Sequence, residues 1–380
     1  MDAASIRTPA NTDFLASMQR QLHLSPKYKL TMNTNIRDSE KEHGEFKLSA
    51  DYQYIPDSIR AQMNESRTHH VSYSGKILET EVNIHFCVYD VADRASIQGW
   101  VNHIEQWLNY ALAHKSEGCV RDKLHVVLLM SHAEKRLPQS GSELADTVHA
   151  NSAFTYSCAN ADLNTITIFR KEDWFKTFIH ETFHRLGLDF SGREGETRYN
   201  SEIAVMFPGV DPTTDFNICE SYCETWAQII NHLFATDTIS KFQASIRKDT
   251  AFATYQMQKF LNIYGHSYDS LTGESANNPS KSKYRENTAA FSYFVIRTAL
   301  QWNLDSFIKW CVENNGTMGP IVFNKNGIKS YVELIRSTHK DPKFLKFARW
   351  VNKSFLPIAN KRCSRNSRSQ FRMTMMEHVI

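Results

Sequence analysis

The residues best able to do chemistry lie in the stretch KTFIHETFHRLGLDF, from Lys176 to Phe190. His180 and His184 stand four positions apart, and Glu181 directly follows the first histidine. On a helix, residues four apart share one face, so the two imidazoles could bind the same tetrahedral zinc ion. The carboxylate of Glu181 would then lie where it could take a proton from water. A buried helix that merely carries two histidines is the alternative.

The residues that flank this motif favour a metal site. Thr177 stands three positions before the first histidine, the positions inside the motif are uncharged, and Leu186 stands two after the second. No proline interrupts the stretch, so it can form one helix, with Asp173 as the expected N-cap and Gly187 just past its end. The stretch thus resembles the short sequence pattern of zinc peptidases. Arg185 departs from that pattern, which has an uncharged residue at this position.

A catalytic zinc needs a third protein ligand, and candidates stand in the stretch NICESYCETWAQIINHLF, residues 217–234. Glu220 and Glu224 are four apart on this predicted helix. Two carboxylates one turn apart repel each other unless a cation lies nearby, which makes the pair informative. Cys219 and Cys223 have the same spacing and are rival ligands, although buried structural cysteine is the commoner case. A solvated acidic face is the simpler reading of the glutamates.

Together these motifs resemble those of the zincin metallopeptidases, in particular the gluzincin group. The resemblance implies that His180, His184 and Glu220 bind one Zn²⁺ ion. Glu181 would be the general base, and Glu224 would hydrogen-bond a ligand histidine. The two glutamates could also exchange roles, which leaves Glu224 as the alternative third ligand. The chain is similar as well to uncharacterised zincin-like proteins of large DNA viruses.

Other residues near the two motifs have smaller expected roles. In another zincin branch the third ligand stands six residues after the second histidine, but Phe190 occupies that position here. Asp189 stands one residue early, so we expect it to cap the helix or to support a ligand. The oxyanion of an acyl-transfer reaction also needs a donor. Tyr293 is the weak candidate that we name for this role, beside Tyr222 and His232.

The resemblance implies hydrolysis of peptide bonds, more specifically an endopeptidase with a polypeptide substrate. We expect residues 149–157 to form an edge strand that pairs with the substrate backbone. Two other functions remain open. The first is a zincin-fold protein that has lost its activity and serves as a binding or virion structural component. The second is a metal-independent α/β protein whose HETFH helix is simply buried.

The pattern of apolar residues supplies the elements that must position these side chains. Alternating or continuous apolar runs predict strands over 79–90, 123–131, 151–158 and 164–170, and a 3.6-residue period predicts helices over 95–114, 218–233, 252–264, 286–302 and 331–351. The predicted fold class is α+β. A zincin-like catalytic lobe, with a mixed sheet and the active-site helix, is followed by a mostly helical lobe.

This layout divides the chain into four expected parts. Residues 1–68 form an N-terminal extension or a small subdomain, and residues 69–190 form the α/β lobe that ends in the HETFH helix. Residues 191–360 form the mainly helical lobe that carries the third ligand. Residues 361–380 form a basic tail that we expect to be disordered.

Composition limits the partners and the location of the protein. With 380 residues and a net charge of +3, no strong field favours nucleic acid or an acidic membrane as a partner. No apolar run approaches the roughly 18–20 residues of a membrane helix, and we recognise no signal peptide. The seven cysteines are scattered, which favours a reducing compartment. We therefore expect a cytoplasmic protein, or one of the host cytoplasm or virion if the chain is viral. The oligomeric state stays open.

Overall fold

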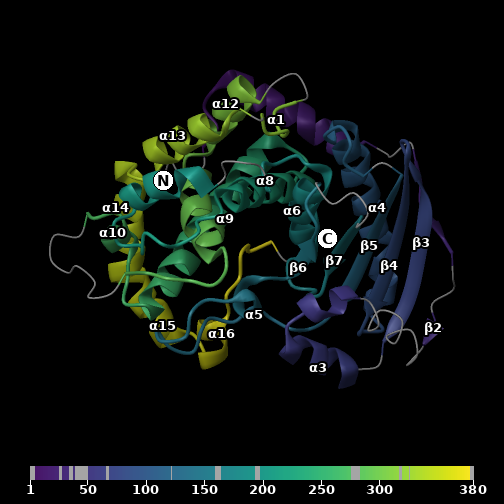
Figure 1. The fold of residues 1–380 in the computed structure, drawn as a ribbon, viewed down its shortest axis with the longest axis horizontal. Helices are drawn as coiled ribbons and strands as arrows, with labels where there is room; N and C mark the ends of the chain where they lie inside the picture. The colour runs from purple at the N-terminus through teal and green to yellow at the C-terminus, as the bar shows by residue number, and fades with distance from the viewer. Residues whose placement is uncertain are drawn as a thin grey trace. The chain divides into compact units, whose positions relative to one another are not determined.

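The computed structural model describes residues 5–24, 28–33, 37–38, 50–65, 68–120, 122–158, 164–192, 197–274, 283–315, 319–324 and 326–376 (Figure 1). The chain divides into two compact units. The first, which we call the sheet unit, comprises Ser17–Glu134, Asn151–Leu188 and Glu377–Ile380. The second, which we call the helical unit, comprises Met1–Ala16, Lys135–Ala150 and Asp189–Met376. The sheet unit combines helices with a β-sheet, and the helical unit is mainly helical. The chain is therefore α+β, which confirms the predicted fold class.

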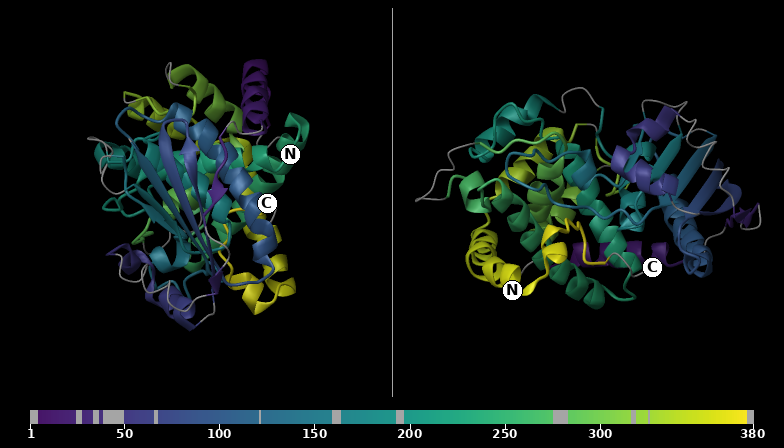
Figure 2. Two further views of the ribbon diagram at one scale, coloured as in Figure 1. Left: turned by 90° about the vertical axis from the view of Figure 1, so that its right-hand side faces the viewer. Right: turned by 90° about the horizontal axis from the view of Figure 1, so that it is seen from below.

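A mixed sheet of seven strands forms the framework of the sheet unit, in the order β1-β3-β4-β5-β7-β6, with β2 also paired to β3. Its strands are β1 (Thr31–Met32), β2 (Arg37–Asp38), β3 (His69–Ile77), β4 (Thr80–Val88), β5 (Lys123–Met130), β6 (Ala153–Thr155) and β7 (Thr165–Ile168). β4, β5 and β7 are parallel neighbours, and β6 is antiparallel to β7 at the end of the order. Figure 2 shows these strands side by side from two further directions.

The sheet buries both of its faces, and the alternation of side chains along β4 shows why. Phe86 points to the face covered by α4 (Asp93–Ala111), where its ring lies 6.1 Å from that of Trp100. Cys87, one residue on, points to the opposite face and packs against Ile59 and Met63 of α3 (Asp57–Glu65). Successive residues of a strand face opposite sides, so one strand serves both cores.

Helical segments complete the sheet unit. These are η1 (Ala50–Tyr54), α3, α4, η2 (Leu112–His114) and α6 (Trp174–Leu186), while α1 (Pro9–Leu22) begins in the helical unit and ends in this one. The two-residue strands β1 and β2 pair with β3 and are part of the sheet. The helix α3 packs against one face of the sheet. The described residues from Ser17 onward therefore belong to the sheet unit, where the sequence predicted an N-terminal extension or a small subdomain.

The described part of the helical unit is built mainly from helices. Its elements are α5 (Thr147–Ala150), η3 (Thr197–Tyr199), α7 (Asn200–Met206), α8 (Ile218–Phe234), α9 (Ile239–Ile263), α10 (Tyr268–Leu271), η4 (Phe291–Ile296), α11 (Arg297–Trp302), α12 (Leu304–Asn314), α13 (Ile328–Thr338), α14 (Pro342–Trp350), η5 (Val351–Phe355), α15 (Leu356–Arg362) and α16 (Arg365–Ser369). η4 is a π-helix, and it packs against α8.

Three predicted helices differ from the observed ones for local reasons. The helix predicted over 252–264 is the second half of α9. The helix predicted from 286 begins only at Phe291, because Glu286 instead accepts a hydrogen bond from the Phe291 amide, 2.8 Å away. The helix predicted over 331–351 is broken after α13, where Pro342 starts a new helix and Asp341 caps it by accepting from the Phe344 amide.

The basic tail is folded as far as Met376, so the expectation of disorder is wrong for residues 361–376. Phe371 is fully buried, and its ring stacks on that of Phe294 with centroids 3.9 Å apart. Thr374 is also buried and donates a hydrogen bond to Asp249 of α9. Two side chains in a basic stretch thus anchor it within the helical unit. Residues 377–380 lie outside the described residues.

None of the helices in the described ranges combines the length and the apolar character needed to cross a membrane.

Candidate metal centre

The HETFH motif lies on α6 of the sheet unit, as its spacing predicts. Asp173 occupies the N-cap position, but its side chain makes no capping hydrogen bond to a backbone amide. Its carboxylate instead accepts a hydrogen bond from the Thr177 hydroxyl at 3.3 Å and lies 3.7 Å from the Lys176 ammonium. Gly187 ends the helix in the left-handed conformation, with φ of 63°, and its amide donates to the carbonyl of His184. The predicted boundaries of this helix are confirmed.

Almost every side chain of α6 is buried, because α4 and the strands β6 and β7 pack around the helix. The Phe183 ring stacks on Trp107 of α4 with an interplanar angle of 16°. Trp174, at the start of the helix, packs against Trp100 of α4. Aromatic contacts of this kind hold the helix in one orientation, which fixes the direction in which its histidines project.

The two histidines point their outer ring nitrogens at each other. The Nε2 atoms of His180 and His184 lie 3.1 Å apart, and the ring planes meet at 73°. Both side chains are buried, at 5% and 9% exposure. A tetrahedral zinc ion bound at about 2.0–2.1 Å by two imidazoles holds their nitrogens about 3.3 Å apart. The geometry of the pair therefore fits two ligands of one zinc ion.

Glu181 differs from its neighbours on α6. It is half-buried, whereas Trp174 to His180 and Thr182 to Leu186 are all buried. A general base has to be reached by water and by the reacting group, so partial exposure suits the role predicted for this carboxylate.

The glutamates predicted as third-ligand candidates lie on α8 of the helical unit and have different surroundings. Glu220 is half-buried in the first turn, where the helix dipole favours a negative charge. Glu224 is 1% exposed and accepts a hydrogen bond from Gln228 at 3.1 Å. Gln228 also donates a hydrogen bond to the carbonyl of Met373, so Glu224 belongs to a buried hydrogen-bond network that reaches the segment around Met373.

The rival cysteine ligands on α8 are both buried. The thiol of Cys223 donates to the carboxylate of Asp189, 3.4 Å away. Asp189 itself is 2% exposed, and the C-cap residue of α6 is Gly187. The two roles expected for Asp189, capping and support of a ligand, stay predictions.

Within the described part of the chain, His180 and His184 of the sheet unit offer two imidazole nitrogens to one metal ion. The helical unit carries the other predicted ligand atoms, which are the carboxylates of Glu220 and Glu224 and the thiols of Cys219 and Cys223.

Two of the candidate oxyanion donors are committed to other bonds. The hydroxyl of Tyr222 donates to the carbonyl of Ile321 at 2.9 Å, and the side chain is fully buried. Burial also raises the pKa of Tyr222 well above its ordinary value. His232 is fully buried between Ser245 and Asp249 of α9. Both therefore serve packing.

Tyr293, the donor that the sequence named, lies on the π-helix η4 and is half-buried. π-helical turns are rare and occur often at functional sites. Because η4 packs against α8, which carries Glu220, Tyr293 remains a candidate donor to the oxyanion.

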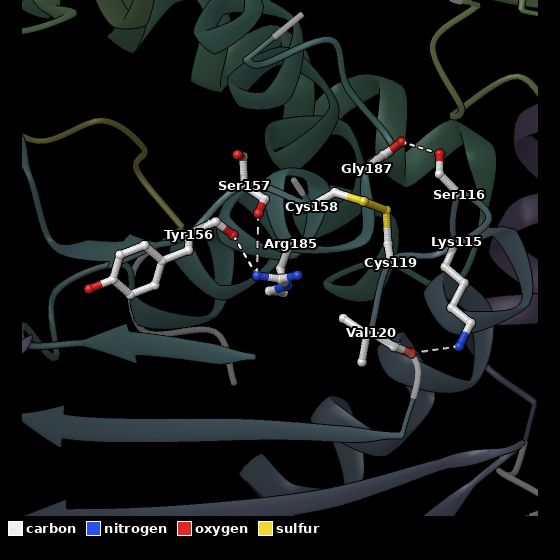
Figure 3. Close-up of a disulfide and its surroundings, with 9 residues drawn as sticks. All are labelled: Lys115, Ser116, Cys119, Val120, Tyr156, Ser157, Cys158, Arg185 and Gly187. Atoms are coloured by element: carbon white, nitrogen blue, oxygen red, sulfur yellow. Dashed lines mark hydrogen bonds between the residues drawn. A yellow bond between two sulfur atoms is a disulfide. The ribbon is translucent and has the colours of Figure 1, made fainter. Parts of the chain in front are cut away.

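A disulfide in the sheet unit is a feature that the sequence did not reveal. Cys119 follows η2, Cys158 follows β6, and their sulfur atoms are bonded (Figure 3). Disulfides are typical of oxidising environments, so this bond runs against the reducing compartment expected from scattered cysteines. Spacing alone could not find the pair, since 39 positions separate the two residues and seven cysteines allow many pairings.

No protein-family model, curated protein or solved structure matched this chain.

Proposed function

We propose that this protein is a zinc-dependent peptidase that cleaves polypeptide substrates internally. The observation that carries the proposal is the buried pair of Nε2 atoms on His180 and His184, 3.1 Å apart. Two buried imidazoles whose nitrogens converge at this distance match the ligand geometry of zinc. Their position on either side of Glu181, on one helix, supports hydrolysis over a purely structural metal site.

Glu220 is the carboxylate that we propose as the third ligand. Glu220 is half-buried in the first turn of α8, where an ion can reach it, whereas Glu224 is 1% exposed and accepts a hydrogen bond from Gln228. Glu224 remains the alternative third ligand, or it would hydrogen-bond one of the ligand histidines. Zinc bound by these residues would polarise the substrate carbonyl and lower the pKa of water.

Glu181 is the residue that moves the proton. Its carboxylate would accept a proton from the attacking water and deliver it to the leaving amine. A half-buried carboxylate can be reached by water and still be partly desolvated, which strengthens its interaction with the reacting groups. We propose Tyr293 as a further, weaker contributor that donates to the developing oxyanion.

The substrate would add a strand to the sheet. β6 is the last strand in the order and pairs on one side with β7. Its three residues are Ala153, Phe154 and Thr155, fewer than expected over 149–157, because residues 147–150 form α5. An extended peptide can bind such an edge through its backbone, which suits a peptidase with a polypeptide partner.

The experiment that tests this proposal measures the metal content of the full chain by elemental analysis. We expect one zinc ion per chain, and close to none in His184→Ala. His132→Ala is the matched control, because His132 is exposed on the sheet unit, where it lies 3.5 Å from the carboxylate of Asp90 and contacts the ring of Tyr89. A chelator should also lower the melting temperature of the unmodified protein, since bound metal stabilises the folded state. Absence of stoichiometric zinc from the unmodified protein would reject the proposal.

A further inference from the structure

The C-terminal end of the helix α6 is tied to the turn that contains Cys119. The amide of Ser116 donates to the carbonyl of Leu186 at 2.9 Å, and the Ser116 hydroxyl donates to the carbonyl of Gly187 at 2.5 Å (Figure 3). These two carbonyls belong to the helix end itself. The turn therefore supplies partners for groups that a helix terminus otherwise leaves unsatisfied.

The Cys119–Cys158 disulfide lies directly against the same helix end. A Cβ atom added at Gly187 would lie 2.7 Å from the sulfur of Cys119 and 3.3 Å from the Cβ of Cys158. Only a glycine leaves room for the sulfur at this point, and it also supplies the φ of 63° that ends the helix. Gly187 stands three residues after His184, so the disulfide packs one turn from a proposed metal ligand.

The turn on the Cys119 side is held in a strained conformation. Val120 has a φ of 47° although it is β-branched, and Gly118 has a φ of 83°. A β-branched residue in this region is unfavourable and persists only when its surroundings impose it. Here the ammonium of Lys115 donates to the Val120 carbonyl at 2.7 Å, and the disulfide fixes the adjacent residue. Breaking the disulfide would remove one of the two restraints.

The segment on the Cys158 side is tied to α6 as well. The buried guanidinium of Arg185 donates to the carbonyl of Tyr156 at 2.9 Å and to that of Ser157 at 3.4 Å (Figure 3). These two residues connect β6 to Cys158. The disulfide thus joins two segments that each hold the end of α6 by hydrogen bonds.

We propose that the Cys119–Cys158 disulfide is a redox-sensitive clamp on the metal-binding helix, opened by thiols of low molecular weight. Cys158 is half-buried and Cys119 is buried, so an incoming thiolate would attack the sulfur of Cys158. The S–S bond breaks, and Cys119 leaves as a thiolate that takes up a proton. A second thiol then attacks the mixed disulfide, which leaves two cysteine thiols on the chain and one disulfide of the small thiol.

Opening the clamp would lower the affinity for zinc, a consequence that rests on the proposed function. With the disulfide reduced, the turn can relax, and the carbonyls of Leu186 and Gly187 lose fixed partners. His184, in the last turn, would then be held less firmly. Residues that orient metal ligands change metal affinity by roughly 10–100-fold when they are lost. Where cellular thiols keep the surroundings reducing, the disulfides that do form are usually transient and redox-sensing.

The test compares the oxidised full chain with the same protein reduced by a phosphine, which does not introduce a competing thiol ligand. Hydrogen–deuterium exchange is followed in peptides that cover 116–120 and 183–188, and zinc affinity is measured by competition with a chromophoric chelator. We expect roughly tenfold faster exchange and about tenfold weaker zinc binding after reduction. The double variant C119S/C158S should resemble the reduced protein under both conditions.

Cys363→Ser is the matched control, because Cys363 is the exposed free cysteine among the described residues. It should respond to reduction as the unmodified protein does. Unchanged exchange after reduction would overturn the clamp, and so would faster exchange with unchanged zinc affinity. Loss of the redox response in Cys363→Ser would overturn it as well. Absence of zinc in both states would instead reject the proposed function, and exchange alone would then decide whether the clamp exists.

Discussion

The guanidinium of Arg185 donates a hydrogen bond to the carbonyl oxygen of Tyr156, 2.9 Å away. Arg185 directly follows His184 and departs from the pattern of the metal motif, which has an uncharged residue there. The side chain is fully buried, and burial lowers the pKa of its guanidinium. The Nη1 atom of Arg185 donates to the carbonyls of Tyr156 and Ser157, so this departure has a structural cause: it fastens α6 to the segment after β6.

Replacing Arg185 by methionine should therefore destabilise the sheet unit. Two carbonyls lose a charged donor, and hydrogen bonds of this kind contribute about 1.5–3 kcal/mol each. Because only the bond to Tyr156 is short, at 2.9 Å against 3.4 Å for the bond to Ser157, we expect a loss of about 2 kcal/mol in the free energy of unfolding, measured by urea denaturation. Arg185→Lys should recover part of this loss, because it keeps the charge but not the planar fork. Equal stability of Arg185→Met and the unmodified protein would contradict this role.

Substitution of Glu181 by glutamine should separate metal binding from catalysis. Glutamine keeps the shape of the side chain but cannot accept the proton, so we expect unchanged zinc content and a 10²–10⁴-fold lower rate of peptide hydrolysis. The measurement uses a peptide-library cleavage assay beside elemental analysis. Glu79→Gln is the control, since Glu79 is exposed and forms a surface ion pair with Lys76.

Two other results of that experiment would point elsewhere. A Glu181→Gln variant that cleaves at the unmodified rate would show that another residue acts as the base. A protein that binds zinc but cleaves nothing, with or without the substitution, would favour the inactive binding or virion component.

The sequence predicted the elements whose signals are local. The period of apolar residues located β4, β5 and α4, and Gly187 marked the end of α6. The buried histidine pair followed from a spacing of four. Features that depend on distant partners were missed. The sequence around Cys119 does not indicate that Cys158 is its disulfide partner. The basic composition after residue 361 predicts a solvated tail, although Phe371 and Thr374 are buried.

Glu286 should make the stability of the helical unit fall as the pH rises. Burial raises the pKa of Glu286 to about 8, against the opposing effects of hydrogen bonds from the Tyr284 hydroxyl and the Phe291 amide. The unfolded chain has the ordinary, lower pKa, so the folded state binds the extra proton between the two values. This contribution is complete below about pH 4.5 and is lost progressively up to about pH 8, at about 1.4 kcal/mol per pH unit.

The free energy of unfolding, measured between pH 5 and pH 9, checks this prediction. Glu286→Gln cannot ionise, so its stability should vary less over this range than that of the unmodified protein. Parallel pH profiles for the two proteins would show that Glu286 does not titrate in the folded state.

Truncation of Phe371 should reveal how firmly the C-terminal segment is anchored. The ring is fully buried and also stacks on Phe260, 4.9 Å away. Deleting a buried aromatic side chain usually costs about 3–5 kcal/mol, so Phe371→Ala should lower the midpoint of thermal unfolding by several degrees. Met375→Ala is the control, because Met375 is 41% exposed. Equal melting temperatures for both variants would contradict the anchoring.

The buried carboxylate of Asp249 accepts hydrogen bonds from the Thr374 hydroxyl and the Met375 amide, which follow it in the chain by 125 and 126 positions. The helical unit also contains Lys135–Ala150, which Asn151–Leu188 of the sheet unit separates in the sequence from Asp189–Met376. Bringing distant segments together costs loop-closure entropy before their contacts repay it, so units built in this way fold slowly. The helix that carries Glu220 and Glu224 therefore reaches its final packing late in folding, after distant segments of its unit have met.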